Sequence, residues 1–197
     1  MRAMLAAAAL LTSLATACGR SATMADTDQV YRAILDSLYF EPGHRPATVV
    51  VDAGTASRDY FRPDSYVVQA TRDLPRDLID DFLAANSAET TLAQFRLVAA
   101  KQVFLDSAQE AAIFAEARRS KVNLDVRRKA WSDFKARYPA APGIITLSRV
   151  GFNRAGTRAL VWVDRRWGVL DASADLVLLT RPHGTWVLQE VRNLAVS

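Results

Sequence analysis

Apolar and polar residues alternate through the C-terminal part of the chain, which is the pattern of half-buried β-strands. The alternation predicts four strands, at residues 144–152, 157–164, 169–180 and 185–191. Turn residues fill 153–156 and 181–184 between them, and a bulge is expected near 171–173. Because short turns join consecutive strands, we expect a four-stranded antiparallel meander.

Apolar residues at helical spacing predict helices over residues 27–39, 75–86, from 107 onward and 125–138. Each begins at a residue type that suits a helix start, namely Asp26, Pro75, Ser107 (in a capping box with Glu110) and Asp125. The helix at 125–138 carries an aromatic stripe of Trp131, Phe134 and Tyr138 between basic residues.

Short apolar runs upstream favour additional strands at 48–52 and 66–70, and part of 95–105 is a third candidate. A sheet this apolar cannot leave both faces in water, so the helices must cover one face. The sequence therefore predicts an α+β fold, with N-terminal and central helices packed on the C-terminal four-stranded antiparallel meander.

The first eighteen residues have the features of a secretory leader. Arg2 precedes an apolar run, residues 4–17, that is too short to span a bilayer permanently. Small residues then precede Cys18, as a lipobox requires, so we expect acylation of Cys18. Cleavage by ordinary signal peptidase after Ala17 is the alternative, and it would give a secreted soluble protein. The predicted organisation is a signal peptide (1–18), a short tether (19–25) and a single domain (26–197).

Cys18 is the only cysteine, so the mature domain has no disulfide, no cysteine nucleophile and no thiolate metal site. Two histidines, His44 and His183, lie beside proline or glycine in expected turns. We therefore predict no bound metal and no cofactor. Membrane attachment would come through the N-terminal lipid.

Charge is distributed unevenly along the chain. Residues 26–116 hold fifteen acidic and eight basic residues, whereas residues 118–166 hold thirteen basic and three acidic. We favour the interpretation that the acidic and the basic half of the chain fold onto one another, so that their charges partly neutralise each other across a single domain surface. The alternative is that the basic helix around Trp131 lies on an anionic membrane surface. Nucleic acid is not expected as a partner, because no recognition motif is present.

One C-terminal pattern resembles an uncharacterised family of exported bacterial proteins. It consists of Tyr138-Pro139, Gly143-Ile144-Ile145, the run from Leu147 to Asn153, Ala159-Leu160-Val161-Trp162-Val163 and Trp186-Val187. The resemblance covers about the last third of the chain. It implies export and a shared fold, and it implies no assigned activity.

Carboxylates provide the only candidates for catalysis. Asp52 follows a buried apolar run and precedes Ala53-Gly54-Thr55, as in aspartic proteases, but a second such segment is missing. The alternative is an aspartate that caps a turn. Asp171 and Asp175 could bind a cation or act as an acid and base pair, or they could protect a strand edge from pairing. A hydrolase using Asp52 or the Asp171/Asp175 pair is therefore an alternative hypothesis.

Ser148, Arg149 and Asn153 are the best candidates for ligand binding, because an arginine with nearby hydroxyl and amide groups can hold an anion. In an extended strand, however, Ser148 and Arg149 point to opposite faces. The leading interpretation is an exported envelope lipoprotein whose domain binds a small ligand or an envelope protein without catalysis.

Overall fold

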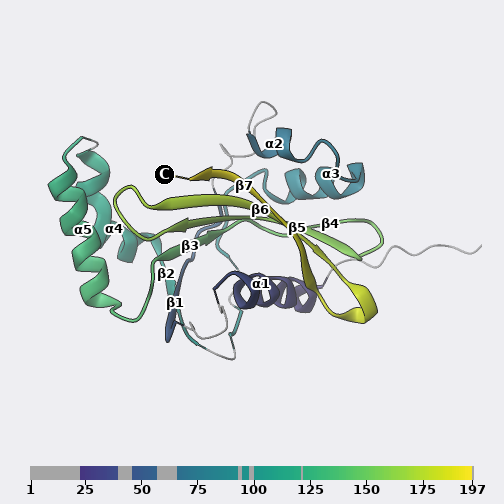
Figure 1. Ribbon diagram of the computed structural model, residues 1–197, viewed down its shortest axis with the longest axis horizontal. Coiled ribbons are helices and arrows are strands. Elements are labelled where there is room, and N and C mark those ends of the chain that lie inside the picture. The colour runs from purple at the N-terminus through teal and green to yellow at the C-terminus, as the bar shows by residue number, and fades with distance from the viewer. Residues whose placement is uncertain are drawn as a thin grey trace, which may run out of the picture.

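The computed structural model describes residues 23–39, 46–56, 66–92, 95–97, 100–120 and 122–196. Within them the chain forms the helices α1 (Met24–Tyr39), α2 (Tyr66–Ala70), α3 (Arg76–Ala85), α4 (Ser107–Arg119) and α5 (Leu124–Arg137) (Figure 1). The strands are β1 (Thr48–Asp52), β2 (Lys101–Leu105), β3 (Ile144–Leu147), β4 (Gly151–Phe152), β5 (Arg158–Arg166), β6 (Ala172–Thr180) and β7 (Val187–Val196). The predicted leader with Cys18, and His44, lie outside the described residues.

The predicted four-stranded antiparallel meander is wrong, because the strands form one seven-stranded mixed sheet. Its order is β2-β1-β3-β5-β6-β7, and β4 pairs with β5. β5, β6 and β7 are antiparallel neighbours, but β1 runs parallel to both β2 and β3. Parallel neighbours are far apart in the chain, so no local turn marks their pairing. The continuously buried run in β1 is typical of a strand covered on both faces.

Two segments predicted as continuous strands fold differently. Residues 144–152 divide into β3 and β4, and Ser148 lies between them. The Ser148 hydroxyl accepts the Trp162 N–H at 2.9 Å, and its carbonyl accepts the Tyr31 hydroxyl at 3.0 Å. Residues 66–70 form α2 instead of a strand, with Val67 packed into the core. Tertiary packing here overrides the β-propensity of a short apolar run.

The helices begin at other residues than expected. N–H groups of the first turns of α1, α4 and α5 donate to the side chains of Thr23, Asp106 and Asn123. Asp26, Ser107 and Asp125 are therefore helical residues, and α1 begins inside the segment predicted as a tether. The bulge predicted near 171–173 is wrong: the register of the β6–β7 pair shifts at Ala174/Asp175 and at Leu178/Leu179, and the extra residue is in β7 each time.

Helices cover both faces of the sheet (Figure 1). On one face, α1 packs through Val30 and Ile34 against a cluster that includes Val161 of β5. On the other face, α2 and α3 cover a cluster around Trp162 of β5. Also on that face, α4 and α5 cover a separate cluster around Ile144 of β3.

The second face is polar between its two apolar clusters. Asp164 of β5 lies directly opposite Thr146 of β3, and Arg166 lies opposite Ile144. Asp52 ends β1 two residues after Val50, which pairs with Ile144. Opposed residues share a face, and so do residues two apart on one strand. We call Asp52, Thr146, Asp164 and Arg166 the polar seam.

Candidate functional site

Arg166 is the centre of the polar seam. One Nη atom lies 3.1 Å from a Glu110 carboxylate oxygen on α4 and 3.8 Å from Asp52 Oδ2. Its Nε lies 3.6 Å from Asp164 Oδ2 but makes no hydrogen bond, although it is buried. A buried donor without an acceptor is costly, so the carboxylates around Arg166 do not fully satisfy its guanidinium.

The carboxyl groups around Arg166 differ in how readily they ionise. Burial raises the pKa of Asp52, and it also raises the pKa of Asp164, because the nearby arginine does not fully offset the loss of water. Burial acts in the same direction on Glu110, but Arg118 and Arg166 outweigh it and hold the pKa of Glu110 below its usual value. Glu110 is therefore the carboxylate most firmly held in its charged form.

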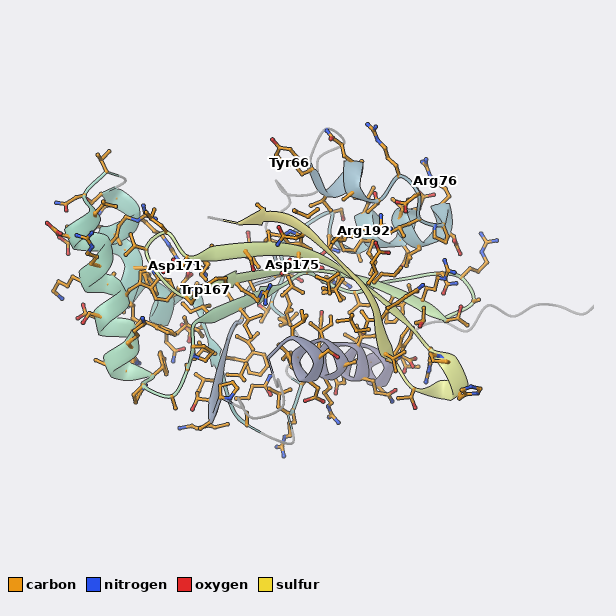
Figure 2. The ribbon with its side chains drawn as sticks, viewed as in Figure 1. Tyr66, Arg76, Trp167, Asp171, Asp175 and Arg192 are labelled. Atoms are coloured by element: carbon orange, nitrogen blue, oxygen red, sulfur yellow. The ribbon has the colours of Figure 1, made fainter. Side chains whose placement is uncertain are left out.

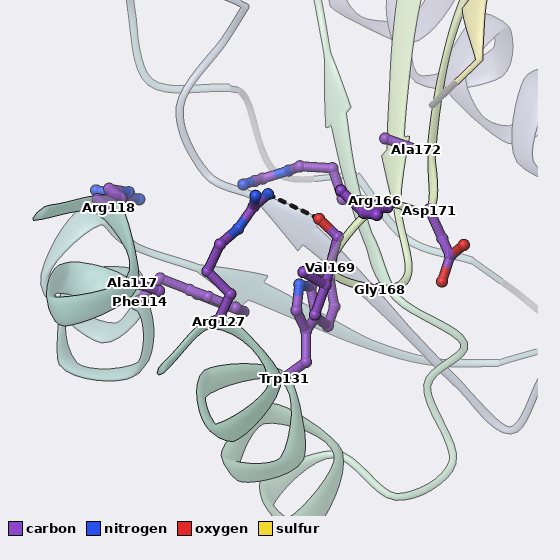
Figure 3. A pocket seen from close by; sticks show the side chains of 11 residues that line it. Phe114, Ala117, Arg118, Arg127, Trp131, Arg166, Gly168, Val169, Asp171 and Ala172 are labelled. Atoms are coloured by element: carbon purple, nitrogen blue, oxygen red, sulfur yellow. Dashed lines mark hydrogen bonds between the residues drawn. The ribbon is translucent and has the colours of Figure 1, made fainter. Parts of the chain in front are cut away.

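A cavity of about 420 Å³ lies beside Arg166, between the α4 and α5 helices and the loop that joins β5 to β6 (Figure 3). Arginines from three elements line it, Arg118 of α4, Arg127 of α5 and Arg166 of β5. The apolar part of its lining includes Phe114, Ala117, Trp131, Val169, Leu170 and Ala172. This volume lies in the range of small-molecule sites. We call this cavity the arginine pocket.

Arg127 joins α5 to the β5–β6 loop. Its Nη2 donates to the Val169 carbonyl at 2.7 Å (Figure 3). The loop is closed by the Trp167 N–H, which donates to the Asp171 carbonyl at 2.9 Å. In the same view Arg127 and Arg166 extend toward each other, whereas the Asp171 carboxylate points away from them. No ion pair between described residues includes Arg127.

Local sequence explains why Arg127 and Trp131 both reach this cavity. The Asn123 side chain accepts the N–H groups of Asp125 and Val126 and so fixes the start of α5. Residues four apart share a face of a helix, so Arg127 lies one turn before Trp131. Trp131 packs edge-on against Phe114 of α4, with ring centroids 5.1 Å apart.

The three predicted ligand-binding residues have different roles in the structure. Ser148 is buried and holds the β3–β4 break, as described above. Asn153 Oδ1 accepts the N–H groups of Thr157 and Arg158, both at 2.8 Å, and thereby closes the β4–β5 turn. Arg149 is exposed and lines a separate cavity of about 460 Å³ beside Tyr31. Ligand binding by Arg149 stays a prediction.

Asp171 and Asp175 are not brought together as a pair (Figure 2). Asp175 lies opposite Val163 and therefore on the face away from the polar seam. Its carboxylate accepts from Arg165 at 2.5 Å and from Asn193 at 2.9 Å. Asp171 is exposed in the β5–β6 loop and is one of the residues that line the arginine pocket.

Asp52 makes the turn contact that was the alternative to a protease role, because its Oδ1 accepts the Gly54 N–H at 2.9 Å. Its Oδ2 lies 3.4 Å from the Thr146 hydroxyl. Neither Asp52 nor Asp164 is among the described residues that line the arginine pocket.

The remaining candidates provide little chemistry. His183 is exposed in a turn with φ of 54°. In the part of the chain that the structure describes, no three His, Cys, Asp or Glu side chains are grouped so as to hold a metal ion. The same part contains no helix with the length and apolarity needed to cross a bilayer.

Sequence reasoning missed the arginine pocket as a site. Arg118, Arg127 and Arg166 carry no motif, and the only signal was the excess of basic residues between 118 and 166. Ion pairs with the acidic half of the chain neutralise part of that excess, which agrees with the interpretation favoured from the sequence. Glu110 pairs with Arg118 and Arg166, and Asp52 pairs with Arg166.

Comparison of the chain with protein-family models, with curated proteins and with solved structures finds no match.

Proposed function

We propose that this chain is an exported envelope lipoprotein, anchored through Cys18, whose domain binds a small acidic ligand and does not transform it. The observation that carries the binding proposal is the convergence of Arg118, Arg127 and Arg166 on one cavity.

The charges around the pocket favour an anion. Glu110 is paired with Arg118 and Arg166, whereas Arg127 bonds only to a backbone carbonyl among the contacts of the described residues. A bound carboxylate or phosphate group would provide the missing countercharge. Arginine is suited to this role because its planar fork can bind two oxygens of such a group at once.

The apolar lining indicates the rest of the ligand. Phe114 and Trp131 form one wall, and Val169 and Leu170 belong to the loop on the other side. Sites for small molecules commonly combine such walls with a few polar groups that set orientation. An acidic group attached to a ring or a short apolar moiety fits this lining.

Binding is better supported than hydrolysis by the position of the carboxylates. Glu110 is paired with two arginines. Asp171 lines the pocket, but its carboxylate points away from Arg127 and Arg166 (Figure 3). Asp52 and Asp164 have raised pKa values but lie outside the described lining of the pocket. A general acid or base must reach the proton that it transfers.

Isothermal titration of the protein with phenyl phosphate tests the binding proposal. We expect Arg127→Gln to weaken binding about tenfold or more, because a charge-assisted hydrogen bond contributes roughly 1.5–3 kcal/mol. Arg137→Gln, a basic residue at the other end of α5, is the matched control and should bind normally. Equal losses in the two variants, or no binding by the unchanged protein, would contradict the proposal. Release of phosphate would favour the hydrolase instead.

The location of the protein has a separate test. Mass spectrometry of the mature amino terminus should find diacylglyceryl or triacyl Cys18 on protein from the membrane fraction. An unmodified amino terminus on protein recovered from the cell interior would contradict export, and cleavage after Ala17 without a lipid would indicate the secreted soluble alternative.

A further inference from the structure

Four large apolar side chains are exposed on two neighbouring segments of the molecule. Val122 is 91% exposed and Leu124 40%, at the connection between α4 and α5. Trp167 is 38% exposed and Leu170 61%, in the β5–β6 loop. We call these four residues the apolar rim. Scattered apolar residues are ordinary on a protein surface, but a group of them is typical of an interaction site.

The fold holds the two segments of the apolar rim together. Leu124 and Leu170 line one groove of about 570 Å³ between α5 and the loop. The hydrogen bond from Arg127 to the Val169 carbonyl fastens the loop to the helix beside this groove. The α4–α5 pair lies at one end of the sheet, where nothing else in the described chain covers it (Figure 1).

Basic side chains accompany the apolar rim. Arg128 and Lys135 line the same groove as Leu124, along one stripe of α5, and Asp171 of the loop is the acidic residue in this lining. Residues 118–137 contain eight basic and two acidic residues. One of the two, Asp125, pairs with Arg128 at 3.1 Å, but both side chains are largely exposed, and such pairs contribute little. The surface therefore combines apolar side chains with an excess of positive charge.

We propose that the apolar rim docks on the surface of an anionic lipid bilayer. Apolar side chains would enter the boundary between head groups and acyl chains, while the basic residues contact acidic head groups. Each basic residue near an anionic surface strengthens attachment about fivefold. A second copy of the chain is a poorer occupant, because it would bring a second set of like charges to the same place.

Two reporter variants of the full-length chain, each also carrying Cys18→Ser and Trp167→Phe, test this proposal, because Trp167 is itself an indole on the apolar rim. Leu170→Trp places an indole on the apolar rim, and Val187→Trp places one at another exposed position, at the start of β7. Both are mixed with vesicles of brominated phosphatidylcholine, with and without phosphatidylglycerol, because bromine quenches an indole only on contact. Since both chains share residues 1–22, any attachment by the leader is the same for both.

We expect the Leu170→Trp reporter to be quenched more than the native tryptophans alone. This additional quenching should require phosphatidylglycerol and should be smaller at high salt. The Val187→Trp reporter should show no such increase. Arg128→Gln with Lys135→Gln should reduce the additional quenching severalfold, whereas Arg76→Gln, on the exposed face of α3, should not.

Equal quenching of both reporters, or quenching that does not depend on lipid charge, would overturn the proposal. So would a concentration-dependent emission shift without vesicles, which would indicate a second copy. None of these outcomes bears on phenyl phosphate binding.

Discussion

Arg165 and Arg166 are consecutive residues of β5, yet they belong to opposite sides of the protein. On one face, Arg165 donates to Asp175, whose other oxygen accepts from Asn193. On the other face, Arg166 lies among Glu110, Asp52 and Asp164, and its Nε has no acceptor. Alternation of side chains along a strand separates the two arginines.

The difference between the two arginines distinguishes a structural ion pair from a candidate site. The Arg165 cluster is closed, because every oxygen of the buried Asp175 carboxylate has a donor. Arg166 lines a cavity and shares its charge among three carboxylates. The Arg166 cluster therefore borders a space that a ligand could enter, whereas the hydrogen bonds of the Asp175 carboxylate are already complete.

The largest expected effect is on stability. Arg165→Met leaves Asp175 buried without its ionic partner, so we expect a loss of about 3 kcal/mol in the free energy of unfolding. Arg166→Met should lose about 1 kcal/mol, since Glu110 keeps Arg118 as a partner and Arg166 is not fully satisfied. Urea denaturation followed by circular dichroism measures both. Equal losses, or a larger loss for Arg166→Met, would contradict the comparison.

The next prediction concerns ligand affinity. Glu110→Gln removes the negative charge between Arg118 and Arg166, so phenyl phosphate should bind several times more tightly, the opposite of the Arg127→Gln effect. Glu116→Gln, an exposed residue of the same helix, provides the matched control and should leave affinity unchanged. Isothermal titration would contradict this prediction if Glu110→Gln bound more weakly.

A smaller effect is expected in the pH dependence of stability. Because the folded-state pKa of Asp52 is raised, its contribution to stability is fully present below its unfolded value of about 3.9 and is lost as the pH rises through the raised pKa. Asp52→Asn keeps an oxygen for the Gly54 N–H and avoids that loss. The variant should therefore be more stable than the unchanged protein near neutral pH, with a difference that narrows on acidification.

Glu110→Gln is the contrasting variant in the same urea experiment. The pKa of Glu110 is lowered, so its contribution is present above its unfolded value and is lost as the pH falls through the lowered pKa. This variant should be less stable than the unchanged protein near neutral pH, and the difference in their free energies of unfolding should also become smaller as the pH falls. Differences of the same sign for Asp52→Asn and Glu110→Gln would contradict the assignment of the two carboxylates.

Local patterns predicted those elements whose stabilising contacts are close in the chain. The β5, β6 and β7 ladder follows from alternation and short turns, and α3 and α5 follow from apolar spacing. The same reasoning placed a strand at 66–70, where packing of Val67 favours a helix. It also failed for the arginine pocket, because its three arginines come from three elements.

The sequence by itself determined which segments are helical or extended in most of the described chain, since periodicity and turn residues act over a few positions. Only the tertiary structure decided that β1 lies between β2 and β3, because parallel pairing depends on contacts between distant segments. That pairing brings Asp52 to Arg166, and the packing of α4 brings Glu110 to the same guanidinium. The candidate site therefore exists only in the folded molecule, where charges distant in sequence share one buried environment.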